Sequence, residues 1–122
     1  MLERLTGKRV ILRKLKLSDA DDMHEYCNDP EFARYALRAT YPHKKSSSAA
    51  FIADSLKNWK KKTAFAWAIE HQGRIIGSLS LKPEEFNKAS TGWGLNRKYW
   101  GLGLTTEAVR LVVDAGFKNL KL

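Results

Sequence analysis

The stretch that most constrains the fold is residues 95–114, where an apolar strand ends, two glycines follow and a helical pattern begins. It reads Leu95-Asn-Arg-Lys-Tyr-Trp-Gly-Leu-Gly-Leu-Thr-Thr-Glu-Ala-Val-Arg-Leu-Val-Val-Asp114. Beyond Gly101 and Gly103, apolar residues recur at helical spacing: Leu104, Ala108, Leu111, Val112 and Ala115. The first N–H groups of such a helix lack intrahelical partners and lie at the positive end of its dipole. A phosphate is therefore the predicted ligand of this turn.

One strand and two helices are predicted before this stretch. Residues 9–14 have strand composition, and Ser18 with Asp21 resembles the capping box of a helix that Pro30 ends. A short helical turn is expected at 31–35 and a loop at 36–45. The serines at 46–48 are N-cap candidates for a second helix, whose apolar face carries Ile52, Leu56 and Trp59.

From residue 64 onward the apolar period changes to two, which is typical of strands. Phe65, Trp67 and Ile69 alternate with small residues, and a turn at 71–74 leads into a second alternating run, so an antiparallel hairpin is predicted. A further strand at 89–96 contains Gly92 and Gly94. Glycine inside a strand marks a bulge or a close backbone approach, and a bulge here could free an N–H for a ligand.

Length and charge restrict the class of protein. The 122 residues fit a single domain, and the net charge of +9 favours anionic partners such as nucleic acid, acidic lipid or a polyphosphate cofactor. The single cysteine, Cys27, excludes an internal disulfide, and no apolar run has the length of a membrane span. We therefore expect a cytoplasmic protein that does not enter the membrane. The three histidines show no ligand spacing, so no metal is expected.

Two phosphate-binding motifs fail on the sequence of the turn. A P-loop needs a lysine after its last glycine, and neither Gly101 nor Gly103 has one. A dinucleotide fingerprint needs a third glycine where Thr106 stands. The acetyl-CoA turn, Arg/Gln-x-x-Gly-x-Gly/Ala, fits Lys98-Tyr-Trp-Gly-Leu-Gly103, with lysine in its first place.

The sequence around this motif closely resembles that of the GNAT superfamily of N-acetyltransferases. Within the superfamily it is most similar to the branch that acts on ribosomal-protein N-termini, aminoglycosides or polyamines. The resemblance spans nearly the whole chain. It rests on five stretches: Arg9-Val-Ile-Leu-Arg-Lys14, Ser18-Asp-Ala-Asp21, Asn28-Asp-Pro-Glu31, Gly73-Arg-Ile-Ile-Gly-Ser-Leu-Ser80 and Gly92-Trp-Gly-Leu-Asn-Arg-Lys-Tyr-Trp-Gly-Leu-Gly-Leu-Thr-Thr-Glu-Ala-Val109.

This resemblance implies a single α+β domain over 1–122, a three-layer GNAT-like fold with a mixed, largely antiparallel sheet flanked by helices. It also implies acetyl-CoA as co-substrate and a primary amine as acceptor, either a protein N-terminus or a small molecule. Matched to the family, the cofactor-binding positions are Gly94, Leu95 and Asn96 for the pantetheine arm, Arg97 and Lys98 for phosphate charge, and Gly101, Leu102, Gly103, Leu104, Thr105 and Thr106 for the pyrophosphate cradle.

Catalytic residues are harder to assign. Where this branch often has an acidic residue the chain has Ser90, and the loop glutamates Glu84 and Glu85 are the substitutes to test. A strand N–H near Gly94 or Leu95 is the expected oxyanion donor. Glu107, in the first turn of the last helix, is expected to be structural rather than a base.

The end of the chain departs from the family pattern. GNAT domains normally continue beyond this helix with another strand, a helix and a hairpin, so the domain is expected to be C-terminally truncated or completed by a second copy or a partner. Two other functions stay open: an inactive CoA-binding or partner-binding module, and a basic nucleic-acid-binding domain, which is disfavoured outside a ribosomal context because the glycine turn would have no role.

Overall fold

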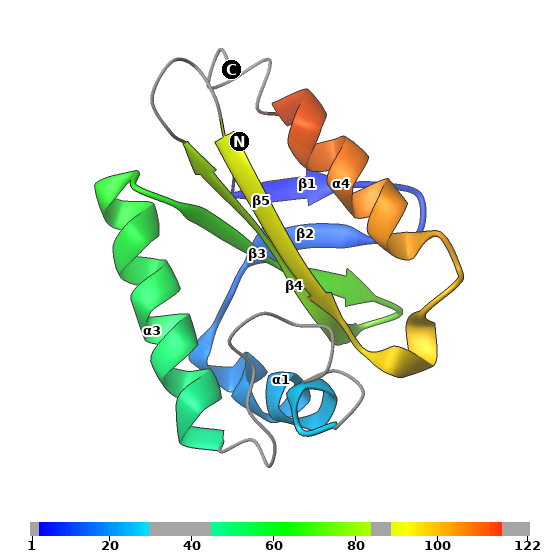
Figure 1. Cartoon of the computed structure of the whole chain (residues 1–122), viewed down its shortest axis with the longest axis horizontal. Coiled ribbons are helices and arrows are strands. Elements are labelled where there is room, and N and C mark those ends of the chain that lie inside the picture. Colours follow the sequence, from blue (N-terminus) through cyan, green and yellow to red (C-terminus); the bar gives the residue numbers. More distant parts are fainter. Residues whose placement is uncertain (1–2, 30–44, 84–88, 116–122) are drawn as a thin grey trace.

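The computed structural model of the chain describes residues 3–29, 45–83 and 89–115. Five strands form one sheet in the order β1-β2-β3-β4-β5, and every neighbouring pair is antiparallel (Figure 1). The strands are β1 (Arg4–Thr6), β2 (Ile11–Lys14), β3 (Phe65–His71), β4 (Arg74–Pro83) and β5 (Ala89–Leu95). The helices are α1 (Ala20–Cys27), α3 (Lys45–Lys61) and α4 (Leu104–Ala115), with short 3-10 turns η1 (Leu17–Asp19) and η2 (Arg97–Tyr99).

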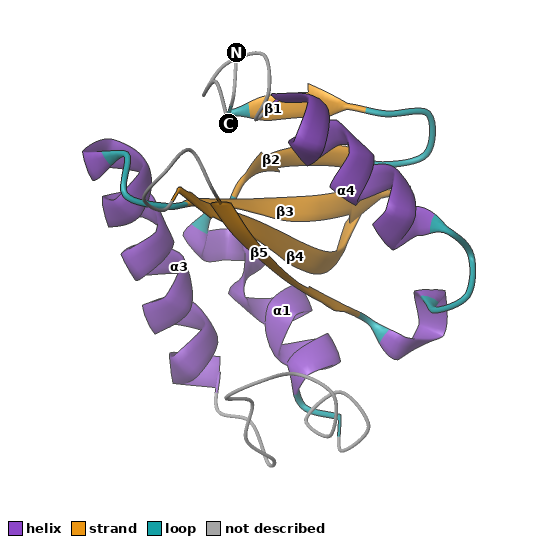
Figure 2. Cartoon of the chain, turned by 45° about the horizontal axis from the view of Figure 1, so that its top comes forward, coloured by secondary structure: helices purple, strands orange, loops and turns teal. Residues whose placement is uncertain are grey.

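Helices cover both faces of the sheet, α1 and α3 on one side and α4 on the other (Figure 2). The alternation in β3 explains this arrangement, because successive side chains of a strand point to opposite faces. Phe65, Trp67 and Ile69 pack in the cluster that includes the apolar face of α4, whereas Ala66 and Ala68 pack with α1 and α3. The predicted three-layer α+β class is therefore confirmed.

Several predicted elements are confirmed, with corrections at their ends. The strand at 9–14 is β2, and the short β1 before it was not predicted. The predicted Ser18–Asp21 capping box is wrong. Asp19 supplies the capping carboxylate instead, because it accepts the Lys16 N–H at 2.8 Å. The serines at 46–48 are not N-caps, since α3 already includes them. The turn at 31–35 and residues 36–44 of the expected loop lie outside the described residues.

The glycines of β5 lie in a regularly paired strand and not in a bulge, and the close approach of β4 to β5 occurs at Gly77 of β4. The register between β4 and β5 is continuous from Gly77 to Pro83, and the only irregularity of the hairpin's register lies between Ile69 and Glu70. A Cβ added to Gly77 would overlap the carbonyl oxygen of Gly94 and lie 3.0 Å from Leu95 Cα. The bulge expected at residues 92–94 is therefore wrong.

Replacing Gly77 with alanine is expected to lower the free energy of unfolding by about 1–3 kcal/mol, because the added methyl group meets backbone atoms that move only if β5 moves. Urea denaturation measures the change. Gly73→Ala is the control, since no heavy atom lies within 4 Å of the added Cβ and only its positive φ of 79° opposes the substitution. A Gly77→Ala protein as stable as the wild type would contradict this packing of β5 on β4.

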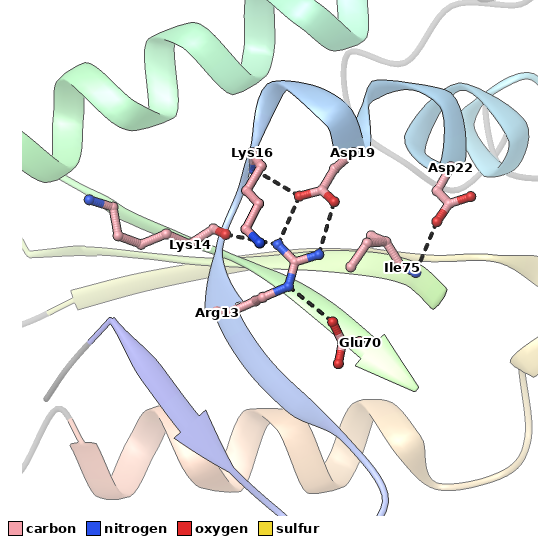
Figure 3. Close-up of polar contacts among 7 residues, drawn as sticks. All are labelled: Arg13, Lys14, Lys16, Asp19, Asp22, Glu70 and Ile75. Atoms are coloured by element: carbon pink, nitrogen blue, oxygen red, sulfur yellow. Dashed lines mark hydrogen bonds and ion pairs between the residues drawn. The ribbon is translucent and has the colours of Figure 1, made fainter. Parts of the chain in front are cut away.

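A buried ion cluster joins β2 to η1 and β3 (Figure 3). Arg13 donates from both Nη atoms to the two oxygens of Asp19, each at 2.9 Å, and from Nε to Glu70 at 3.0 Å. Burial favours the neutral form of Asp19, but the hydrogen bonds from Arg13 and the Lys16 N–H outweigh it, so the pKa of Asp19 lies below its usual range. The cluster fixes the position where α1 begins.

None of the helices within 3–29, 45–83 and 89–115 is both long and apolar enough to cross a membrane.

Candidate cofactor-binding site

The glycine turn lies between the end of β5 and the start of α4, as predicted (Figure 1). Gly101 and Gly103 have φ angles of 79° and 75°, a backbone region that L-residues with side chains rarely adopt. Both glycines are therefore required by the backbone itself. Leu104 is the first residue of α4, and its side chain is buried while that of Leu102 is 53% exposed.

The turn presents a row of available N–H groups. The first N–H of this region with a backbone acceptor is that of Glu107, which donates to the Gly103 carbonyl at 3.1 Å. Within the described part of the chain, the N–H groups of residues 102–106 have no hydrogen-bond partner. They include the N–H groups of 102–105 that the family resemblance assigns to a pyrophosphate, and the N-terminus of a twelve-residue helix adds a favourable dipole.

A cation from the other end of the chain lies on this turn. Arg9, in the connection between β1 and β2, donates from Nη1 to the Leu102 carbonyl at 2.7 Å and from Nη2 to the Gly103 carbonyl at 3.3 Å. Its Nε donates to Glu107 at 3.0 Å. Sequence reasoning placed Arg9 only in a strand, and no local signal pairs it with residues more than 90 positions away.

Glu107 is structural, as predicted, although its role is more specific than matching the helix dipole. Its Oε2 accepts the N–H groups of Arg9 and Val10 at 2.8 and 3.0 Å. Burial favours the neutral carboxyl, but these hydrogen bonds and the Arg9 charge outweigh it and lower the pKa of Glu107. A Cβ on Gly7 would lie 2.6 Å from Oε2, so the absence of a side chain at Gly7 allows the carboxylate to reach the β1–β2 turn.

The predicted pantetheine positions differ from one another in the direction of their N–H groups. Asn96 donates its N–H to the Ile76 carbonyl on β4 at 2.6 Å, and strand groups alternate in direction. The N–H of Gly94 therefore also faces β4, and that of Leu95 faces the opposite edge. Trp100 folds back on that edge, where its Nε1 donates to the Leu95 carbonyl at 2.9 Å. Leu95 is thus the one of the three that can offer an N–H to a ligand beside β5.

The two cations predicted for phosphate charge are not both on the turn. Lys98 directs its Nζ toward Glu25 of α1, 3.7 Å from Oε1, and its N–H donates to the Asn96 side chain at 3.0 Å. The Lys98 side chain is 74% exposed. Arg97 begins η2, and its side chain lies outside the described residues.

The catalytic candidates are the least defined part of the site. Glu84 and Glu85 lie outside the described residues. Ser90 pairs with Lys82 near the start of β5, about 17 Å along the strand from Leu95. Metal ligands are a separate question. In the described ranges there is no group of three or more histidine, cysteine or acidic side chains that could hold a metal ion. Cys27 packs, partly buried, against the core cluster of α1 and α3, and burial raises the pKa of its thiol.

Comparison with known proteins identifies the family and supports the fold. The family model for the Acetyltransferase (GNAT) domain matches residues 9–122. The uncharacterized N-acetyltransferase p20 of Bacillus licheniformis is 30% identical over 99% of this chain and 70% of its own length. The microcin C7 self-immunity acetyltransferase MccE, solved with acetyl-CoA and AMP, superposes with a TM-score of 0.82 at 20% identity, over 93% of this chain and 64% of that one. RimL, a ribosomal L7/L12 alpha-N-protein acetyltransferase solved with coenzyme A, gives 0.81 at 18% identity, over 92% and 66%.

The chain therefore belongs to the GNAT acetyltransferase family, whose members use acetyl-CoA, so the predicted superfamily and co-substrate are confirmed at the level of the family. It spans about two thirds of the length of the solved relatives.

Proposed function

We propose that this chain binds acetyl-CoA along the outer edge of β5 and on the turn before α4, and transfers the acetyl group to a primary amine. The observation that carries the proposal is the row of partnerless N–H groups at 102–106, on the turn before α4, together with the N–H of Leu95 on the outer edge of β5. A pyrophosphate on the turn and a pantetheine arm beside the strand would use both sets of donors.

The transfer itself is a direct acyl exchange. The amine nitrogen attacks the thioester carbon, a C–N bond forms, the C–S bond breaks, and the proton lost by the amine balances the one gained by the CoA thiolate. The N–H of Leu95 is the group we assign to the carbonyl oxygen as charge develops on it. Glu84, Glu85 and Ser90 stay candidates for the base.

A protein N-terminus is the acceptor whose amine is least costly to deprotonate. At pH 7, deprotonating a lysine-like amine with a pKa near 10.4 costs about 4.6 kcal/mol, whereas an α-amine near 7.8 costs about 1 kcal/mol. A weak base or a water molecule suffices for the α-amine. The likeness of the fold to RimL, which is an alpha-N-protein acetyltransferase, points the same way. The net charge of +9 argues against polyamines, which it repels.

Isothermal titration calorimetry of the 122-residue chain with acetyl-CoA and with CoA is the first test. We expect binding with a Kd in the micromolar range and a rise in melting temperature of a few degrees when the ligand exceeds Kd about a hundredfold. Peptides with free N-termini, with N-terminally blocked peptides as controls, then report turnover through release of the CoA thiol.

The outcomes separate the alternatives. Absence of both heat and a melting shift would exclude CoA binding by this chain. Binding without turnover on any amine would favour the inactive CoA-binding module. Affinity for nucleic acid that falls steeply with salt and ignores CoA would favour the basic nucleic-acid-binding domain. Size-exclusion chromatography at the same concentrations tests whether a second copy of the chain completes the domain as a homodimer.

A further inference from the structure

We propose that Arg9 is a positioning residue for the cofactor: it holds two carbonyl groups of the glycine turn so that the adjoining N–H groups face the pyrophosphate. We call this arrangement the Arg9 clamp, meaning Arg9, Glu107 and the carbonyl groups of Leu102 and Gly103. The inference rests on the proposed function, because it assigns Arg9 to the same acetyl-CoA site.

The argument begins with peptide geometry. In a trans peptide the C=O of one residue and the N–H of the next lie in one plane and point in opposite directions. Arg9 binds the carbonyl of Leu102 at 2.7 Å and that of Gly103 at 3.3 Å. The N–H groups of Gly103 and Leu104 consequently point away from the guanidinium. The clamp therefore fixes the direction of two donors in the predicted cradle, in a turn whose glycines would otherwise allow many conformations.

Arg9 is itself held from several sides. Its N–H donates to Glu107 at 2.8 Å, and its carbonyl oxygen lies 2.9 Å from His71 Nδ1, which must donate because a carbonyl only accepts. The His71 ring in turn meets Tyr99 of η2 edge to face, with ring centroids 5.8 Å apart. Elements before and after the glycine turn thus lock the residue that shapes it.

Each nitrogen of the Arg9 guanidinium already donates to an acceptor of the protein. Its Nε, Nη1 and Nη2 each donate to a different acceptor, namely Glu107, the Leu102 carbonyl and the Gly103 carbonyl. Three of the five N–H donors of the guanidinium are therefore engaged within the protein. This occupancy favours a role in shaping the cradle over direct binding of the 3′-phosphate of CoA.

Exposure distinguishes this role from a merely structural one. The Arg9 side chain is 49% exposed. Because solvent screens its ion pair with Glu107, that pair contributes little to the free energy of folding. Two charge-assisted hydrogen bonds that set the direction of ligand-binding donors matter more for binding. Loss of Arg9 should therefore reduce affinity much more than stability.

The test is calorimetry and thermal unfolding of Arg9→Met in the full 122-residue chain. We expect the Kd for CoA to rise about ten- to hundredfold and the melting temperature to fall by less than about 4 °C. Arg9→Met should lose affinity for dephospho-CoA by the same factor as for CoA, because dephospho-CoA lacks the 3′-phosphate but keeps the pyrophosphate. Arg9→Lys keeps the charge but loses the fork of donors, so it should not restore affinity.

Lys8→Met is the matched control, since it removes the same charge from the neighbouring exposed position, and it should change the Kd by less than about twofold. If the wild type binds CoA and Arg9→Met binds equally well, the inference is wrong and the proposed function stands. Restored affinity in Arg9→Lys, or a loss confined to CoA over dephospho-CoA, would also overturn it. A wild type that binds no CoA overturns both proposals together.

Discussion

A Gly103→Val protein is expected to bind acetyl-CoA roughly a hundredfold more weakly than the wild type, a loss of about 2.7 kcal/mol. Gly103 has a φ of 75°, which a β-branched residue adopts only under strain. Its added Cβ would lie 3.3 Å from Arg9 Nη2, and the two methyl groups beyond it would displace the guanidinium. The donors of the turn would lose their common direction. Calorimetric titration with acetyl-CoA measures the change.

Gly73→Val is the control for this substitution. Gly73 has nearly the same backbone angle, 79°, and an added Cβ there meets no heavy atom within 4 Å. It lies in the β3–β4 hairpin, whereas Gly103 lies at the start of α4, so the two variants share backbone strain but not the site. Both should lose about 1–2 kcal/mol of stability, and only Gly103→Val should lose the cofactor. If Gly103→Val binds acetyl-CoA within about threefold of the wild-type affinity, the placement of the pyrophosphate on this turn is wrong.

The strand, glycine turn and helix at 95–114 could be predicted because each signal is local. The 3.6-residue period of α4 and the two glycines lie within one window, and the packing of Leu104, Ala108 and Val112 in the core agrees with that period. The hairpin was equally readable, since its alternation and turn are adjacent in sequence.

The Arg9 clamp could not be predicted, because its partners are 93 to 98 residues apart in the chain. Nothing in the composition of residues 7–10 distinguishes an arginine that binds carbonyl groups from one exposed at the end of a strand. The role of Gly7 could not be predicted for the same reason. A side chain at Gly7 would collide with the carboxylate of Glu107 on α4, 100 residues later.

The choice of Leu95 over Gly94 and Asn96 also required the structure. Sequence defines which residues form β5, but the parity of its hydrogen bonds depends on its register with β4, which the Asn96–Ile76 pair sets. The expected bulge at the β5 glycines failed for a related reason. Glycines inside a strand suit both a bulge and close strand packing, and the register decides between the two: β5 pairs with β4 without a break, with Gly94 opposite Ser78 and Gly92 opposite Ser80.

Asp19→Asn is expected to destabilise the fold by about 3 kcal/mol. The side chains of Arg13 and Asp19 are only 14% and 7% exposed, so removing the carboxylate leaves a guanidinium shielded from water with Glu70 as its remaining charged partner (Figure 3). The Lys16 N–H also loses a charged acceptor. Urea denaturation at pH 7 measures the loss.

Asp21→Asn is the matched control two residues away. Asp21 forms an ion pair with Lys45, but its side chain is 76% exposed, so solvent screens the interaction. Its loss should cost less than about 0.5 kcal/mol. Equal costs for the two variants would show that the Arg13–Asp19 pair gains nothing from its burial.

The dependence on pH separates the charge of Asp19 from its shape. Its pKa in the folded chain is lower than the value of about 3.9 expected in the unfolded chain, so its contribution is present above that value and is lost as pH falls through the folded pKa. The stability gap between the wild type and Asp19→Asn should therefore be constant from about pH 7 to 5 and narrow below about pH 4. Urea denaturation at pH 7, 5 and 3 follows the gap. A gap that persists undiminished at pH 3 would mean that the shape of the side chain, and not its charge, holds β2 to η1.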